Sequence, residues 1–127
     1  MKIWVDDIRP APKGYFWCKS VNEAKAKIIN QEKLFHSACN QARYHFLNDN
    51  YQFVDDYLKE SEEVKINLID IDHDAGDFYH DGGDFIRLLD WLEETERNYP
   101  IRIHSQNPVG IENMRRIIQR NGWEEVT

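Results

Sequence analysis

The sequence predicts a single α/β domain built on a mainly parallel sheet, and three observations favour that class. Short apolar segments alternate along the chain with segments whose apolar residues recur at helical spacing. The segment 65–71 has an interior that is apolar on both faces, which is typical of a central parallel strand covered by helices. The 127 residues, 41% of them hydrophobic, are enough for one core, so we expect one domain over 1–127.

The first part of the chain predicts two strands joined by an irregular loop. Residues 2–5 (KIWV) and 15–18 (YFWC) are short and rich in residues that favour strands. The loop 6–14 contains two prolines and a glycine. This loop is too short for a helical crossover between parallel strands. We therefore expect the first helix of a regular doubly wound domain to be reduced to a loop.

A long helical region is predicted next. Ser20 is a favoured N-cap residue, and Glu23 follows it at the spacing of a capping box. Residues 30–63 predict a helical insertion with a break near 48–50. The many aromatic residues of this insertion are interpreted as core, with a partner surface as the alternative.

The second half of the chain predicts two further strands, each followed by a helix. Residues 65–71 form the third strand, and a helical stripe runs through 85–92 with Asp84 as its predicted N-cap. Residues 101–105 (IRIHS) form the fourth strand, which ends in polar residues.

Strong signals also mark both ends of the last helix. Asn107 is a favoured N-cap, and Pro108 is favoured at the first helical position. Gly122 is a favoured residue just beyond a helix C-terminus. Residues 123–126 predict a final short strand.

The charge balance limits the classes of partner. The chain has 16 Lys and Arg against 23 Asp and Glu, a net charge of -7. This excludes an extended nucleic-acid surface or an anionic membrane as a generic partner, so a phosphate group must be held locally. No apolar run reaches the ~20 residues of a membrane span, and the N-terminus does not resemble a signal peptide. Cys18 and Cys39 lack metal-type spacing and suit a reducing compartment, so we expect a cytoplasmic location.

Polar residues follow three of the predicted strands at the point where each strand ends. The C-terminal ends of parallel strands meet at one edge of a sheet, and ligands bind at this edge in open α/β folds. The residues expected there are Asp6 and Asp7 after the first strand, Asp70, Asp72, His73 and Asp74 at the end of the third, and His104, Ser105 and Asn107 after the fourth.

So many carboxylates in one crevice repel each other unless some are protonated or a cation joins them. Carboxylate oxygens suit Mg²⁺ or Mn²⁺, while histidines nearby favour Mn²⁺, Fe²⁺ or Zn²⁺ and offer a general acid or base. Arg9 can hold a phosphate bidentately, and the helix start at Asn107 attracts anions. This combination predicts phosphoester chemistry.

Structural roles are the alternative for each of these residues. Asp6 and Asp7 can form an ordinary turn, and Asp70 can be a satisfied carboxylate within a strand. His104 can simply bond a backbone carbonyl, and the segment 105–107 can serve only as turn and cap.

The sequence also resembles a known family. The segments that carry the resemblance are WVDDIRPAPKG, YFWCKSVNEA, IDIDHDAG, DGGDFIRLLDWL and IRIHSQNPVGIENMRRII. Together they resemble the cyclic-phosphate-processing receiver-like domains, a divergent branch of the receiver fold of response regulators. The resemblance covers nearly the whole chain except 30–63. It implies a flavodoxin-like three-layer sandwich with sheet order 2-1-3-4-5. It also implies activity on cyclic phosphates, such as 2′,3′-cyclic ends of RNA, and a role in RNA repair.

The resemblance assigns positions as well. Asp6 and Asp7 match the acidic pair that holds Mg²⁺ in receivers, Asp72 falls near the phospho-acceptor, and Ser105 falls near the fourth-strand hydroxyl. His73 and His104 belong to this branch and not to ordinary receivers. The lysine that ordinary receivers carry after the fifth strand has no counterpart here, which argues against phosphorelay signalling.

The leading hypothesis is therefore a metal-dependent phosphoesterase, a phosphoric ester hydrolase acting on a small phosphorylated ligand or an RNA terminus. In this hypothesis Asp6, Asp7, Asp72 and Asp74 hold a divalent cation, Mg²⁺ or Mn²⁺. His73 and His104 act as acid and base in either order, with Asp72 in the catalytic group, and Arg9, Ser105 and Asn107 hold the phosphate. The alternatives are a non-enzymatic receiver-like signalling or partner-binding module and a degenerate domain with a structural role.

Overall fold

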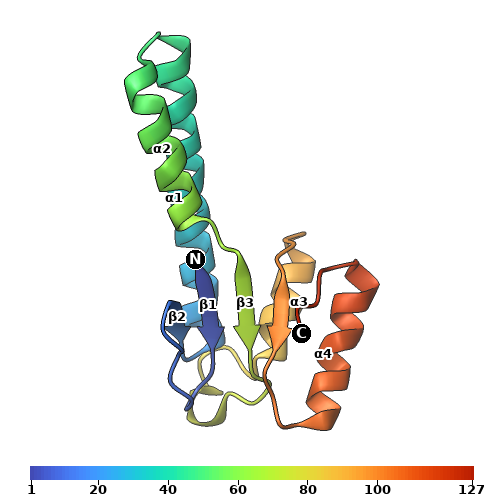
Figure 1. Ribbon diagram of the computed structural model, residues 1–127. Coiled ribbons are helices and arrows are strands. Elements are labelled where there is room, and N and C mark those ends of the chain that lie inside the picture. Colours follow the sequence, from blue (N-terminus) through green and yellow to red (C-terminus); the bar gives the residue numbers. More distant parts are fainter.

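A four-stranded parallel sheet lies at the centre of the structure, a computed structural model that describes residues 1–127 (Figure 1). The strands are β1 (Lys2–Val5), β2 (Tyr15–Cys18), β3 (Leu68–Ile71) and β4 (Ile101–Ile103), in the order β2-β1-β3-β4. The first two strands lie where the sequence predicts them. The third starts at Leu68 and not at Lys65, because its neighbour β1 starts at Lys2, the residue that pairs with Leu68.

The predicted fifth strand is reduced to one bridge. Ile101 pairs in parallel with Glu125, and its N–H donates to the Glu124 carbonyl over 2.9 Å. The order 2-1-3-4 is therefore observed, whereas a full fifth strand at 123–126 is not formed. β4 is only three residues long and offers a short edge for further pairing.

Four α-helices complete the chain: α1 (Val21–Leu47), α2 (Tyr51–Val64), α3 (Ile86–Glu94) and α4 (Pro108–Asn121). A short 3₁₀ turn spans Gly76–Phe78. Ser20 caps α1 as predicted, since its hydroxyl accepts from the Glu23 N–H over 3.0 Å. Asn107 caps α4 in the same way at the Gly110 N–H, and Gly122 ends that helix with φ 66°.

The prediction that Asp84 caps α3 is wrong. The helix starts at Ile86, and its flanking residue Phe85 makes no side-chain cap. The Asp84 carboxylate turns toward the preceding loop, where it accepts the Ala75 N–H over 3.0 Å. This carboxylate therefore braces the loop after β3, and the helix start goes without a side-chain cap.

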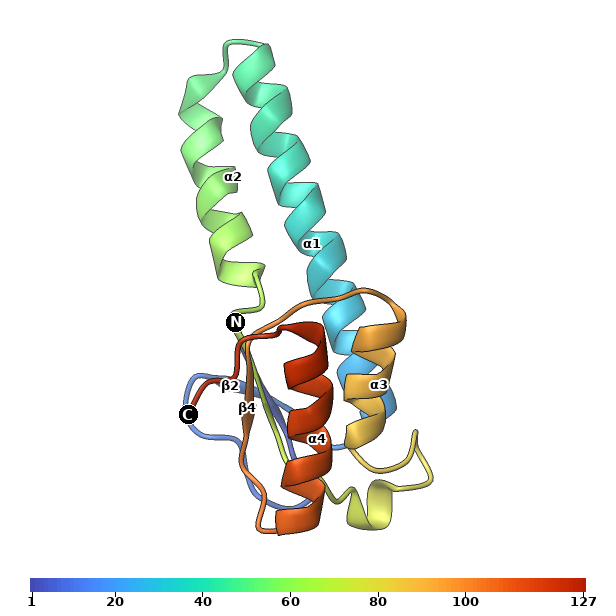
Figure 2. The ribbon, with the colours of Figure 1, turned by 90° about the vertical axis from the view of Figure 1, so that its right-hand side faces the viewer.

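Helices α1 and α2 form an antiparallel hairpin that projects away from the sheet (Figures 1 and 2). The predicted break near 48–50 is confirmed. The interpretation of its aromatic residues as core is wrong near the tip, where Tyr44, Phe46 and Tyr51 are exposed. The tip extends beyond the sheet, so these side chains have no second layer to pack against. No helix in the chain is long and apolar enough to cross a membrane.

The helices cover one face of the sheet only. The register places Ile3, Val5, Ile69, Ile71 and Ile101 on one face, where they are fully buried in the main core. Figure 2 shows α1, α3 and α4 on this side of the strands and no helix on the other side. The expected three-layer sandwich is therefore wrong: the sheet and one helical layer form two layers. The loop 6–14 replaces the first crossover helix, and no helix follows α4 in these residues.

An ion pair between Glu93 and Arg120 joins α3 to α4, and it predicts how stability depends on pH. Arg120 donates twice to the Glu93 carboxylate, each over 2.7 Å, and Asn121 donates to it over 2.5 Å. These hydrogen bonds lower the pKa of Glu93 from 4.5 to about 2. Because the pKa of Glu93 is lower in the folded than in the unfolded protein, the ion pair stabilises the protein fully above pH 4.5. This stabilisation is lost as the pH falls toward 2.

Glu93→Gln is therefore expected to lower the free energy of unfolding at pH 7, with a deficit that shrinks as the pH falls below 4.5. Urea titrations of both proteins at pH 7, 4 and 3 measure this deficit. Glu94→Gln is the matched control, because the exposed Glu94 makes no side-chain hydrogen bond. Equal effects of the two substitutions at every pH would contradict the assignment.

Candidate active site

The ends of β1, β3 and β4 meet at one edge of the sheet, as the sequence analysis expects. Two backbone hydrogen bonds extend the ladder past the strands and bring the polar residues together. The Asp72 N–H donates to the Val5 carbonyl, and the His104 N–H donates to the Ile71 carbonyl, each over 2.9 Å. Asp6, Asp72 and His104 therefore emerge side by side.

The side-chain carboxylates of Asp6, Asp7 and Asp72 lie close together, and we call these three residues the carboxylate group. One oxygen from each lies within 4.8 Å of the others. Asp6 and Asp72 are 1% and 9% exposed, while Asp7 is half-buried. Burial raises the pKa of Asp7, and the charges of Asp6 and Asp72 add to the rise. The close approach of these like charges, and the oxygen-only donor set, fit a hard divalent cation such as Mg²⁺ or Mn²⁺.

The loop after β3 closes tightly over this group. Gly76 has φ +52°, and a Cβ atom there would overlap the Asp7 carboxylate. Only glycine lets the backbone approach at this point. The carboxylate group is thus covered by backbone rather than by a side chain.

His104 is held between two buried carboxylates. Its Nδ1 lies 2.6 Å from Asp70 Oδ1, and its Nε2 lies 2.9 Å from Asp6 Oδ2. The indole of Trp4 stacks on the imidazole with 3.7 Å between ring centroids. Both ring nitrogens are therefore engaged, so His104 offers no free nitrogen to a substrate.

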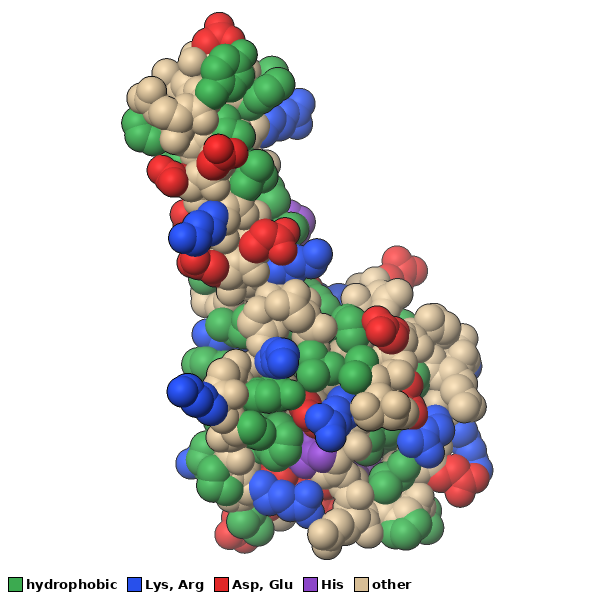
Figure 3. All heavy atoms as spheres, viewed as in Figure 1, with side chains coloured by type: hydrophobic (Ala, Val, Ile, Leu, Met, Phe, Trp, Pro, Cys, Tyr) green, Lys and Arg blue, Asp and Glu red, His purple; other side chains and the backbone are tan.

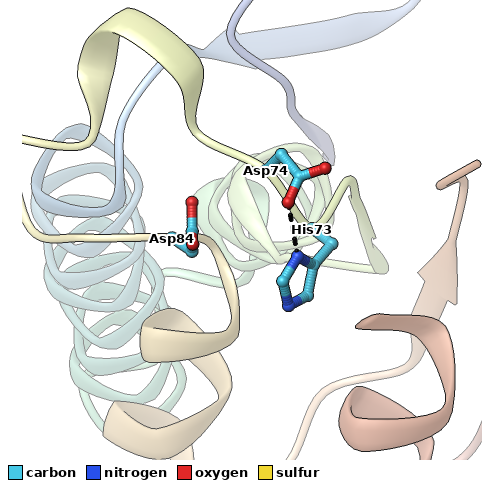
Figure 4. A group of neighbouring side chains, drawn as sticks. All are labelled: His73, Asp74 and Asp84. Atoms are coloured by element: carbon cyan, nitrogen blue, oxygen red, sulfur yellow. Dashed lines mark hydrogen bonds and ion pairs between the residues drawn. The ribbon is translucent and has the colours of Figure 1, made fainter. Parts of the chain in front are cut away.

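His73 has a different environment (Figure 4). Its Nδ1 lies 2.7 Å from Asp74 Oδ1, and its Nε2 has no hydrogen-bond partner in the chain. His73, Asp74 and Asp84 have ligand-type atoms within 4.8 Å of one another. Asp74 therefore lies with His73, and the structure does not bring it into the carboxylate group. The side chain of His73 is oriented at one nitrogen and free at the other.

The His73 ring packs against the start of α4, which gives a further prediction. A Cβ atom at Gly110 would lie 2.5 Å from His73 Cγ. Gly110→Ala is expected to displace the imidazole and lower the free energy of unfolding by about 1 kcal/mol, since overpacking outweighs the gain in helix propensity. Urea unfolding and the NMR shifts of the His73 ring measure the two effects. Gln119→Ala, on the exposed part of α4, is the control, and equal behaviour of the two variants would contradict the contact.

The predicted phosphate-binding residues lie at the same edge. Arg9 is exposed and donates from Nη1 to the His104 carbonyl over 3.2 Å, which leaves its other guanidinium nitrogens free. The Ser105 hydroxyl accepts the Asn107 N–H over 3.1 Å, and Asn107 caps α4. Both hydrogen bonds stabilise the turn that leads into α4. The side chains of Ser105 and Asn107 therefore have a structural role at this turn.

Three residues contribute to the site without a role predicted from the sequence. Asp70 carried a signal, because a carboxylate inside an apolar strand needs a buried partner, here His104. Asp84 was interpreted as a cap, and its contact with the 72–78 loop depends on the tertiary fold. Trp4 gave no signal, since an aromatic residue in a strand is ordinary.

Parallel strands in the order 2-1-3-4, with an acidic pair after β1 and another carboxylate after β3, define a receiver-like α/β domain. A family model described as the cyclic-phosphate processing receiver domain matches residues 1–120, and the chain belongs to this family. No curated protein and no solved structure gives a significant match.

Proposed function

We propose that the protein is a metal-dependent phosphoesterase that opens cyclic phosphates, such as the 2′,3′-cyclic ends of RNA or of nucleotides. The observation that carries this proposal is the pairing of His73 with Asp74 next to the carboxylate group: Nδ1 is tied to Asp74 while Nε2 is free. The family description supports the substrate class.

In this proposal Asp6, Asp7 and Asp72 hold the cation. When bound, such an ion stabilises negative charge on phosphoryl oxygens and lowers the pKa of a coordinated water. His104 acts as a positioning residue, because its ring fixes the Asp6 carboxylate from one side while the N–H groups of Ile8 and Arg9 fix it from the other. Asp74 lies outside this set and orients His73 instead.

His73 acts as the general base. With Nδ1–H donating to Asp74, the neutral ring presents Nε2 as an acceptor, which takes a proton from the water that attacks phosphorus. A P–O bond forms to this water as one ring P–O bond breaks. The leaving 2′- or 3′-oxygen takes a proton from solvent water and is released as the hydroxyl, while His73 returns its proton to solvent. Arg9 and the first turn of α4 hold the remaining phosphoryl oxygens.

The test is the conversion of a 2′,3′-cyclic nucleotide, followed by ³¹P NMR with Mn²⁺ or Mg²⁺ present. The proposal expects a 2′- or 3′-monophosphate as product, and loss of turnover in excess EDTA. If neither ion supports turnover of the nucleotide or of an RNA oligomer with a cyclic end, the proposal fails. Beryllofluoride binding at Asp72 without hydrolysis would instead favour a signalling module.

A further inference from the structure

The face of the sheet that no helix covers has an unusual composition. The register places seven residues on it: Lys2, Tyr15 and Leu68 in one row, and Trp4, Trp17, Asp70 and Arg102 in the next. We call this set the open face. All-parallel sheets are normally covered on both sides, so a face left free in this class needs a reason. We propose that the open face binds a short segment of single-stranded RNA whose 3′ end reaches the carboxylate group. This inference rests on the proposed function and names its substrate class.

The open face offers aromatic rings in fixed orientations. Trp4 and Tyr15 meet edge to face with 5.8 Å between centroids. The indole N–H of Trp4 donates to the Arg9 carbonyl over 2.8 Å, and that of Trp17 donates to the Asp6 carbonyl over 2.7 Å. Rings that are already ordered lose little entropy when bases stack on them. Trp4, Tyr15 and Trp17 are partly exposed, and aromatic residues at the surface of a sheet are a common platform for unpaired bases.

Cations flank these rings although the chain as a whole is acidic. Lys2 Nζ lies 5.4 Å from the Tyr15 ring centroid, and Lys19 Nζ lies 4.5 Å from that of Trp17. Arg102 is half exposed, and its closest carboxylate contact, with Asp70, is 3.9 Å long, so it is free to pair with a phosphate. Figure 3 shows Lys and Arg side chains among hydrophobic ones on this side of the molecule. Against a net charge of -7, this local charge complements a phosphate backbone.

A buried acceptor without a partner lies on the same face. Asp70 is 1% exposed, and its Oδ1 bonds His104, whereas its Oδ2 has no hydrogen-bond partner. This oxygen is itself closed to a ligand, because it has almost no accessible surface. The half-exposed Arg102 guanidinium lies 3.9 Å from it and is the member of this pair that a ligand can contact.

The size and position of the open face fit a short strand. Strands of four residues at four sheet positions span roughly 13 Å by 15 Å, which suits two or three nucleotides. Trp4 stacks on His104 at the carboxylate edge, so a strand lying across the rings leads directly to that edge. A patch this small is distinct from the extended nucleic-acid surface that the acidic composition argues against. RNA is favoured because a 2′,3′-cyclic phosphate needs a 2′-oxygen.

The chain contains a matched pair of residues for the test. Tyr15 lies on the open face under Lys2, whereas its neighbour Phe16 lies on the opposite face of β2 under Lys27. Binding of a fluorescent RNA hexamer with a 2′,3′-cyclic end is measured by anisotropy in EDTA, so that no turnover is needed. Tyr15→Ala is expected to weaken binding about 5- to 100-fold, the effect of losing one base stack, while Phe16→Ala changes it less than twofold.

Two further measurements keep the outcomes separate. Lys2→Ser is expected to reduce the slope of log affinity against log salt by about 0.7, and it serves if Tyr15→Ala fails to fold. Turnover of the hexamer is expected to fall in Tyr15→Ala together with its binding, while Phe16→Ala keeps the wild-type turnover of both the hexamer and a mononucleotide. If wild-type protein does not bind the hexamer, or if Tyr15→Ala and Phe16→Ala bind it equally, the inference is wrong and the open face is left for a protein partner. If the wild-type protein binds the hexamer but does not turn it over, only the proposed function is refuted.

Discussion

Replacing His73 by alanine is expected to lower kcat for the opening of a 2′,3′-cyclic nucleotide by about 10²- to 10⁴-fold, the usual contribution of a general base. The reason is the free Nε2 of a ring that Asp74 holds at Nδ1 over 2.7 Å. Because His73 is not in the carboxylate group, its removal should leave cation binding nearly unchanged. Steady-state kinetics at saturating Mn²⁺ measure the effect on the chemical step.

Two control variants separate this role from a general loss of structure. Asp74→Asn is expected to cost less than His73→Ala, because the base remains and only its orientation and tautomer are disturbed. His80→Ala should have no effect, since His80 is exposed and lies outside the site. If His73→Ala keeps the wild-type kcat, the assignment of the base is wrong.

Replacing His104 by alanine is expected to cost about 3–5 kcal/mol in the free energy of unfolding, because it leaves buried carboxylates without their partner. Asp6 and Asp70 are each 1% exposed, and both point at the imidazole. The stacking contact with Trp4 is lost as well. Urea unfolding monitored by far-UV circular dichroism measures this cost.

Urea unfolding of a double variant tests whether the unpartnered carboxylates cause this loss of stability. The double variant Asp70→Leu with His104→Leu removes both members of a buried hydrogen-bonded pair, and such replacements cost less than breaking the pair. It should therefore be more stable than His104→Ala. His36→Ala, at an exposed position on α1, is the control for loss of an imidazole. A loss below 1 kcal/mol for His104→Ala would show that the two carboxylates do not depend on it.

The location of the site could be predicted from the sequence because it depends on one rule of topology. Parallel strands end at a common edge, so acidic residues after β1 and β3 and a histidine after β4 had to meet there. The caps at Ser20 and Asn107 were also predictable, since the interaction is local.

The division of the polar residues into separate groups could not be predicted. Asp72, His73 and Asp74 are consecutive, yet Asp72 joins Asp6 and Asp7 while His73 and Asp74 lie near Asp84. Which side chain points where depends on the turn after β3 and on its contact with Gly110 of α4, both tertiary features.

The missing second helical layer was also beyond the sequence analysis. The loop 6–14 was correctly interpreted as too short for a helix. However, the family resemblance implied helices on both faces, whereas α1, α3 and α4 all lie on the same side of the strands. The row of Trp4, Trp17, Asp70 and Arg102 could be assigned to one face only once the strand register was known.

The claim on which the rest of the account depends is that Asp6, Asp7 and Asp72 hold one divalent cation, and Mn²⁺ titration followed by electron paramagnetic resonance tests it directly. The account predicts one tightly bound ion per chain, with affinity at least ~10-fold weaker in Asp72→Asn and unchanged in Asp77→Asn, an exposed acidic residue outside the group. Wild-type protein that binds no Mn²⁺, or an Asp72→Asn variant that binds it equally well, would contradict the account.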